Sequence, residues 1–495
     1  MGYNNLVDEK TSLENKSTVV SIPTSPSDDD KLLRRIDMFL MPLLCVTYGL
    51  QYSDKTSLSS GVVFGLRTDT HLIGQQYAWL STLFYLGYML AEFPMSTALQ
   101  IFPLGKFLAI TAIVWGGLVM CLSACQNFTQ LAVIRFLLGV SESAITPGFL
   151  MVVASWYKRS EMTSRSLWWL SMNTVFSSFF GLVIYFLAKH AQDSGGLAAW
   201  RVINLFLGAC TVFHGCILFL LLGTPDEVRW LTAAQKEAAK ARITSNGTGD
   251  GGRREWNWKQ VRECFRDPQI WLFFSFNIIA TIPSGSLATF GPLVYVSFGF
   301  TNLETIIYAL PNSAMALGWF LFVALTIQKF PSMRFPLMTF SVLPPFIGLL
   351  SIGLLPDSTE KWVKWGLYNM TSTFTVPTLL AWTLIPLNVA GRTKKTVISG
   401  STFISYSVGQ LIGTQVFRAS DAPRYIKALT AISIVFGVQI LVTVAWKVYY
   451  SHENTRRNRE QAAAGISTEE NDLVNEHAAR EDKTDLENRS FRYVC

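Results

Sequence analysis

Four charged residues stand inside apolar stretches of the chain, where a charge is energetically unfavourable. Asp54 and Lys55 lie in QYSDKTSL, and Arg135 and Glu142 lie in RFLLGVSES. A charge at the middle of a bilayer costs roughly 2.5–3.5 kcal/mol on insertion scales, and such residues usually line water-filled cavities and ion or proton paths. These two acids and two bases are therefore the first candidates for chemistry.

Their spacing indicates that the four groups lie close together. Arg135 and Glu142 are seven residues apart, which is two helical turns, so they share one helix face with Gly139. Asp54 and Arg135 are each about six residues below the outer ends of their helices, so their depths match. One interpretation is purely structural: Asp54 pairs with Arg135, and Lys55 pairs with Glu142, to hold helices together.

The other interpretation is coupled binding of a proton and an anion. A buried carboxylate can take up and release a proton near neutral pH, and a neighbouring cation attracts an anionic substrate. An anion that neutralises the cation increases the proton affinity of the acid beside it. The anion and the proton would then bind together, with a definite sign of coupling.

The elements that must position these residues are membrane-spanning helices. Of 495 residues, 50% are hydrophobic and 15% are charged, whereas soluble domains carry about 25% charged residues. Apolar windows of about twenty residues, the length that crosses a bilayer, recur twelve times between 36–60 and 424–450. Lys and Arg gather in the loops of one side, which the positive-inside rule assigns to the cytosol.

The predicted fold is an all-α integral membrane protein with twelve transmembrane helices in two pseudo-symmetric six-helix bundles, both termini cytosolic. The expected regions are a disordered cytosolic tail (1–31), an N-terminal bundle (32–222), a cytosolic linker with an amphipathic helix (223–268), a C-terminal bundle (269–450) and a charged cytosolic tail (451–495). We expect the linker helix (226–243) to lie on the inner membrane surface. The basic pairs Lys158-Arg159 and Lys394-Lys395 most simply serve topology.

Several stretches resemble the anion:cation symporter branch of the major facilitator superfamily, and within it the fungal allantoate permease-like group. They are QYSDKTSL, YAWLSTLFYLGYMLAEFP with FPLGK, RFLLGVSESAITPGF with WYKRSE, and LNVAGRTKK with DAPRY. The resemblance covers residues 32–450. It implies two parallel six-helix halves that transport by alternating access.

The resemblance also implies roles for individual residues. Asp54 and Glu142 would carry the coupled protons, Lys55 would hold the substrate carboxylate, and Tyr52 and Tyr88 would contact substrate. Lysine replaces the arginine of the bacterial sugar-acid carriers of this branch, so a point charge replaces a bidentate fork.

Three further residues are expected to bind substrate by the same resemblance. Arg135 would tune Glu142 or pair with Asp54. Asn369 and Thr373 share a face of the tenth predicted span (362–390), which lines the cavity in this fold. The chain departs from its group in the eleventh span, where Gly409-Gln410 and Gly413-Thr414-Gln415 replace Gly-Asn and Gly-Pro-Gln.

The function expected from these residues is proton-coupled symport of a small organic anion, such as allantoate, another ureido acid or a vitamin acid. We expect a monomer in a fungal plasma membrane, with no cofactor, no metal and no nucleic-acid partner. An exporter or vacuolar carrier of a secondary metabolite, or a non-transporting nutrient receptor, are the alternatives. No Ser/His/Asp, metal or nucleotide motif supports an enzyme.

Overall fold

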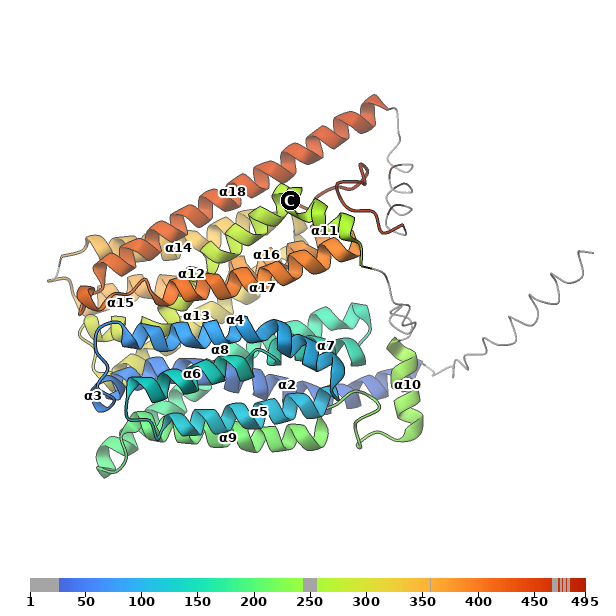
Figure 1. Ribbon diagram of the computed structural model, residues 1–495. Coiled ribbons are helices and arrows are strands. Elements are labelled where there is room, and N and C mark those ends of the chain that lie inside the picture. Colours follow the sequence, from blue (N-terminus) through green and yellow to red (C-terminus); the bar gives the residue numbers. More distant parts are fainter. Residues whose placement is uncertain are drawn as a thin grey trace, which may run out of the picture.

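Twelve helical segments cross the regions that the apolar windows predicted, and they form two bundles of six (Figure 1). The computed structural model describes residues 26–243, 256–356, 358–464 and 481–495, with Asn471, Val474 and Ala478. Most of the predicted disordered tail, 1–31, lies outside these residues, but α2 already begins at Pro26.

The N-terminal bundle is made of α2 (Pro26–Val63), α4 (Gln76–Ile101), α5 (Leu104–Leu122), α6 (Phe128–Glu142) continued by α7 (Ile145–Trp156), α8 (Arg159–Ser194) and α9 (Ala199–Leu221), with the short α3 (Leu66–Asp69) after α2. The C-terminal bundle is made of α12 (Pro268–Ser297), α13 (Asn302–Lys329), α14 (Arg334–Leu354), α15 (Lys361–Asn369) continued by η3 (Met370–Thr373) and α16 (Val376–Asn388), α17 (Arg392–Thr414) and α18 (Ile426–Ala463). The linker contains α10 (Ala233–Ile243) and α11 (Trp258–Arg266).

Helix packing repeats between the two bundles. The extensive α5–α9 contact recurs as α14–α18, and α2–α8 recurs as α12–α17. Across the molecule, α4 packs against α17, α8 against α13, and α2 against α12. The predicted arrangement of two pseudo-symmetric bundles is therefore confirmed.

Eight of the twelve segments meet a length and mean-hydropathy criterion for spanning a membrane in the described chain. The other four are α2, α4, α8 and α17, and each of them contacts the opposite bundle. Helices that face a space between bundles need not be apolar on every side, because part of their surface is shielded from lipid. Polar residues of α2, α4 and α17 can therefore lie at the inter-bundle surface.

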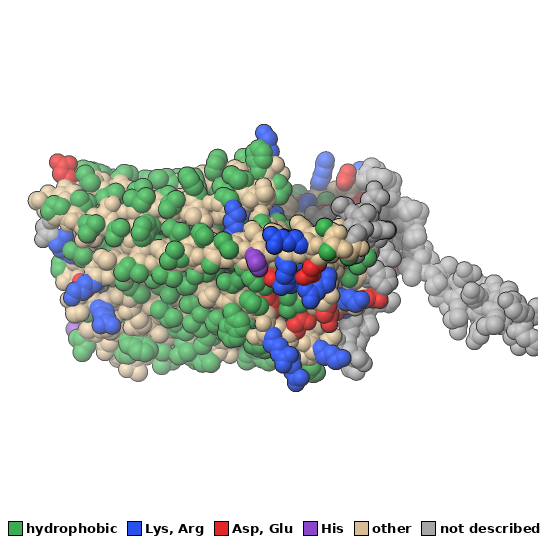
Figure 2. All heavy atoms as spheres, turned by 90° about the horizontal axis from the view of Figure 1, so that it is seen from above, with side chains coloured by type: hydrophobic (Ala, Val, Ile, Leu, Met, Phe, Trp, Pro, Cys, Tyr) green, Lys and Arg blue, Asp and Glu red, His purple; other side chains and the backbone are tan. Residues whose placement is uncertain are grey.

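Apolar and charged side chains separate along the helix axes. Hydrophobic side chains cover the length of the helices in Figure 2, and charged side chains gather at the end that carries the linker. This is the end that the basic loops assign to the cytosol.

The outer ends of the two bundles are joined by hydrogen bonds. The Gln75 side chain donates to the Phe417 carbonyl at 3.1 Å, and the Tyr77 hydroxyl donates to the Thr289 carbonyl at 2.6 Å. The Thr82 hydroxyl lies 2.7 Å from that of Thr414 and accepts from Gln415 Nε2 at 2.6 Å. Thr414 and Gln415 belong to the motif that departs from the group pattern, so this departure contributes to outer closure.

The first part of the linker packs against the N-terminal bundle, where we expected a helix on the membrane surface. The Trp230 ring stacks on Phe39 and Trp156, with centroids 4.8 and 5.3 Å apart. In α10, the buried Arg242 pairs with Asp29 and, at 2.9 Å, with Glu161. A buried cation needs such partners, so α10 is held by the bundle. Residues 244–255 lie outside the described chain.

Lys394 holds a buried ionic cluster at the cytosolic end of the C-terminal bundle. Its Nζ lies 2.6 Å from Asp267 Oδ2, 2.9 Å from Asp485 Oδ1 and 3.1 Å from Glu263 Oε1. The side chains of Lys394, Asp267 and Asp485 are fully buried. Burial raises the pKa of Asp267, and Lys394 opposes that rise.

The end of the chain is part of this cluster, because residues 481–495 fold back onto the bundle. Arg457 donates to the carbonyls of Asp485 at 2.9 Å and Phe491 at 2.8 Å, and the Tyr493 ring stacks on Tyr450 at 4.6 Å. The predicted charged tail thus begins as a continuation of α18 and ends as a packed segment.

Lys394→Met should destabilise the protein by about 3–5 kcal/mol, because it leaves buried carboxylates without their cation. The loss should be larger at pH 8 than at pH 5. Burial raises the pKa of Asp267 in the folded protein, so the stability that its neutral form contributes is present at low pH and is lost as the pH rises through the raised pKa. At pH 8 the carboxylate is ionised and depends on Lys394. Thermal unfolding of the purified protein at both pH values measures this.

The matched control is Lys395→Met, whose ammonium makes an exposed 3.4 Å hydrogen bond to the Pro386 carbonyl. It should leave the melting temperature nearly unchanged. Equal melting temperatures for the two variants would contradict the role given to Lys394.

Candidate functional site

Lys55 and Glu142 form an ion pair between α2 and α6. Lys55 Nζ lies 3.3 Å from Glu142 Oε2, and the side chains are 25% and 2% exposed, respectively. The ammonium also lies 5.7 Å from the ring centroids of Phe84 and Tyr88 on α4. The Lys55 ammonium is therefore surrounded by a carboxylate and two aromatic rings but stays partly accessible. This arrangement is suited to binding a second anion.

Glycines let α4, which carries Phe84 and Tyr88, pack closely against α6, which carries Glu142. A Cβ on Gly139 would lie 1.9 Å from the Phe84 carbonyl oxygen, and one on Gly87 would lie 2.3 Å from the Phe136 carbonyl oxygen. Small residues allow such backbone approach between membrane helices. Glu142 is the last residue of α6, because Pro147 cannot supply the N–H that would continue the helix there.

Asp54 faces the interior of the N-terminal bundle, although it is the neighbour of Lys55. Its Oδ2 accepts a 3.5 Å hydrogen bond from Thr211 of α9, and the Trp115 indole of α5 faces the same carboxyl group. Asp54 and Arg135 are 4% and 3% exposed. Successive residues on a helix point about 100° apart, so α2 sends its two charges to different places.

Of the two ion pairs that the purely structural interpretation required, the described residues form one. Lys55 contacts Glu142, whereas Asp54 and Arg135 interact electrostatically without reaching contact distance. Asp54 Oδ1 and the Nε and Nη2 atoms of Arg135 are buried without a hydrogen-bond partner. A complete helix-holding network would have satisfied these atoms.

Tyrosines from both bundles surround the charged residues. Tyr52 and Tyr88 lie near Tyr406 of α17, close enough for electrostatic interaction, and Tyr406 interacts with Glu142 in the same way. The Tyr406 ring also lies 6.2 Å from that of Trp382. Tyr406 was not predicted from sequence; its local signal is only a run of small polar residues, STFISYSVG.

The two site residues predicted in the C-terminal bundle make contacts within that bundle. The Thr373 hydroxyl donates to the Ser341 carbonyl of α14 at 2.6 Å. The Asn369 amide donates to the Trp365 carbonyl at 2.8 Å, and its Oδ1 is buried without a partner. Their contact with substrate stays a prediction, and Asn369 retains an acceptor for it.

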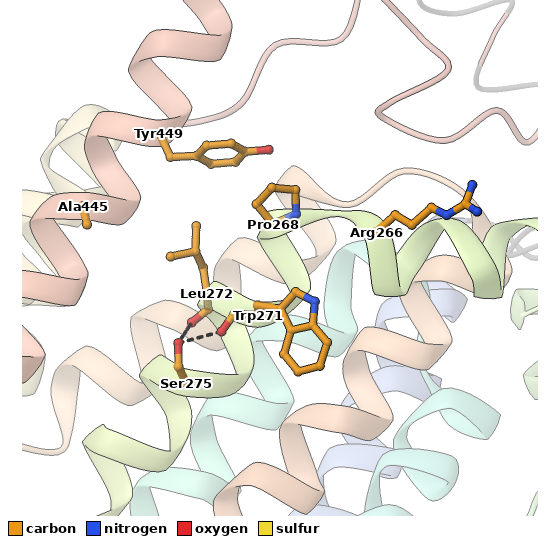
Figure 3. A pocket seen from close by; sticks show the side chains of 7 residues that line it. All are labelled: Arg266, Pro268, Trp271, Leu272, Ser275, Ala445 and Tyr449. Carbon is orange, nitrogen blue, oxygen red and sulfur yellow. Dashed lines mark hydrogen bonds between the residues drawn. The ribbon is translucent and has the colours of Figure 1, made fainter.

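The described chain offers no metal site, and a groove found in it lies apart from the charged residues. No group of three or more His, Cys, Asp or Glu side chains is placed there to hold a metal ion. A groove of about 560 Å³ lies between the start of α12 and α18, and Figure 3 shows its lining: Arg266, Pro268, Trp271, Leu272, Ser275, Ala445 and Tyr449. Its largely apolar wall is at the cytosolic end of α12, away from Lys55.

The two-bundle fold, with a buried ion pair near tyrosines of both bundles, is typical of a membrane transporter, and comparison with known proteins agrees. The model of the Major Facilitator Superfamily matches residues 44–414. The chain belongs to this superfamily.

Curated relatives align over nearly the whole chain. The chain is 31% identical to the allantoate permease of Saccharomyces cerevisiae over 99% of its length and 90% of that protein. It is 30% identical to the thiamine pathway transporter THI73 of the same yeast, over 94% of this chain and 86% of that one. An uncharacterized transporter of Schizosaccharomyces pombe is 32% identical over 94% of this chain and 86% of its own.

Solved structures share the fold at low identity. A D-xylose-proton symporter superposes with a TM-score of 0.64 at 14% identity, covering 81% of this chain and 95% of that one. The Escherichia coli xylose transporter in an inward-open conformation gives 0.62 at 13% identity, over 81% and 94%. Structural neighbours and relatives are transporters, in agreement with the prediction that the chain is not an enzyme.

Gly139→Ala should disrupt the site, because its methyl group would meet backbone atoms of α4 that no rotamer change can clear. Overpacking costs about 1–3 kcal/mol. We expect a lower melting temperature and less protein at the membrane. Gly117→Ala in α5 is the control, since nothing lies within 4 Å of its Cβ position. A Gly139→Ala protein as stable as Gly117→Ala would contradict the packing described.

Proposed function

We propose that this protein carries a small organic anion into the cell together with a proton, by alternating access of its two bundles. The observation that carries the proposal is the Lys55–Glu142 pair, at 3.3 Å, with Lys55 partly accessible and Glu142 buried. The carboxylate of Glu142 is the charged partner of Lys55 here, and the carboxylate of an incoming substrate can take its place.

Exchange of that partner gives the coupling. An anion that takes Lys55 leaves Glu142 in a low-dielectric site without its cation. An uncompensated buried carboxylate is strongly unfavourable, so Glu142 then binds a proton. Anion binding therefore favours proton binding, and by linkage the proton favours the anion to the same degree.

Asp54 is proposed as the second proton carrier. It is almost fully buried, lies behind the ion pair rather than beside the anion, and has an oxygen without a partner. A carboxyl group in such a place can exchange a proton without meeting the substrate. Arg135, which interacts electrostatically with both acids, would tune the two sites.

The substrate class is supported by Lys55 and by the aromatic wall. An ammonium attracts a carboxylate as a point charge, and Tyr52, Tyr88 and Tyr406 offer hydroxyl groups and ring faces for the remainder of a small polar molecule. The similarity to allantoate permease supports allantoate and other ureido acids as the first candidates. We propose the plasma membrane as the location.

The outer hydrogen bonds of Gln75, Tyr77 and Thr82 represent the state closed to the outside. Release of these bonds would open the anion site outward, as rocking of two rigid bundles requires.

Uptake of labelled carboxylates, with allantoate first and then vitamin acids, tests the proposal in cells expressing the chain at pH 5 and pH 7.5. Wild-type uptake of one anion should be several-fold faster at pH 5. Glu142→Gln and Asp54→Asn should each lower that uptake at least tenfold or remove its pH dependence. Lys55→Met should abolish it, because the anion loses its cation.

Glu304→Gln is the matched control, since Glu304 is a partly exposed capping residue of α13 and glutamine can serve in the same capping box. Its uptake should equal the wild type. Uptake that ignores pH and both acid substitutions would exclude the proposed coupling, and absence of any uptake would favour export or sensing.

A further inference from the structure

Buried polar atoms without partners gather around Asp54. In the described chain, those on α2, α5 and α6 near this residue are Gln51 Nε2, Asp54 Oδ1, Trp115 Nε1, Arg135 Nε and Arg135 Nη2. All four side chains belong to residues at most 4% exposed. Buried polar groups are normally satisfied by protein or by internal water, so this set marks a polar cluster inside the N-terminal bundle.

Trp115 is one member that neither the sequence analysis nor the proposed function uses. It is fully buried on α5 and its indole interacts with the Asp54 carboxyl group, while the indole N–H makes no hydrogen bond within the described chain. On the other side, the Thr211 hydroxyl lies 3.5 Å from Asp54 Oδ2 and 2.9 Å from the Leu207 carbonyl, so its one hydrogen is shared between these two acceptors. A buried indole N–H usually finds an acceptor, and here the facing carboxyl group is a direct or water-mediated one.

We propose that Trp115 and Thr211 are positioning residues that hold the carboxylate form of Asp54 by donating to it, and so set the pH at which this residue exchanges the coupled proton. The inference rests on the proposed function, because it assigns the surroundings of one of its proton sites. It places that site between α2, α5 and α9, apart from the anion site at Lys55.

The direction of the effect follows from the donors. A hydrogen bond to a carboxylate favours its charged form, so removing a donor makes Asp54 hold its proton up to higher pH. The charged and titratable groups that also act on Asp54 are Arg135 and Glu142 of α6 and Cys210 of α9, while Lys55 pairs with Glu142. None of these is changed when the indole N–H is removed.

The test is the pH profile of anion uptake in Trp115→Phe. Its midpoint should move to higher pH by about one unit, a tenfold change in proton affinity, with KM for the anion at pH 5 unchanged. In Asp54→Asn, the added Trp115→Phe should not alter the profile further. Trp156→Phe is the control: it removes an equally buried indole N–H, one that donates to the Gly223 carbonyl at 2.8 Å, and should not move the midpoint.

Thr211→Val and Thr211→Ser give a second test that does not depend on the folding of Trp115→Phe. The valine variant loses the donor and should shift the midpoint upward, and the serine variant keeps it and should not. An unmoved midpoint in both Trp115→Phe and Thr211→Val, with wild-type uptake still pH-dependent, would overturn this inference alone. Wild-type uptake that is indifferent to pH would instead overturn the proposed function.

Discussion

The transport site depends on the need to keep the charges of Lys55 and Glu142, which lie inside the membrane, close to a compensating group. Lys55 and Glu142 satisfy this need for one another across 3.3 Å. Beside this pair, Gly139 lets α6 approach the backbone of α4 at Phe84. Removing one partner of an ion pair in a low-dielectric site costs much free energy, because the other charge is left uncompensated. Replacing that partner by another group of the same charge avoids this cost. That difference allows an anion to enter without leaving Lys55 unpaired.

The adjacent charges of α2 separate two tasks. Lys55 faces α4 and α6, among aromatic rings, and is partly accessible. Asp54 faces α5 and α9 and is nearly inaccessible. A proton needs only a path of polar atoms, whereas an organic anion needs a cavity, so the two can be held on different sides of one helix. Arg135 and Glu142 connect the sites, because both acids act on the same guanidinium.

The sequence predicts the charged residues and their depth well, because charge in an apolar window is a strong local signal. The spans, the bundle division and the closeness of Lys55 to Glu142 follow from hydropathy, loop charge and the seven-residue spacing. Trp115 and Tyr406 could not be predicted, because they reach the site from helices with no local mark of function. Lys394 is consistent with a topology residue in sequence, and only folding brings Asp485 from the chain end to within 2.9 Å of it.

In the proposed coupling, the anion and the proton bind together because the anion takes Lys55 and the proton takes Glu142, so that neither member of the pair is left uncompensated. The most direct test is calorimetric titration of the purified protein with the transported carboxylate at pH 7.5, in two buffers of different ionisation enthalpy. The account predicts net proton uptake on binding, close to one proton per anion, and its loss in Glu142→Gln. Binding with no proton uptake in the wild type would contradict it.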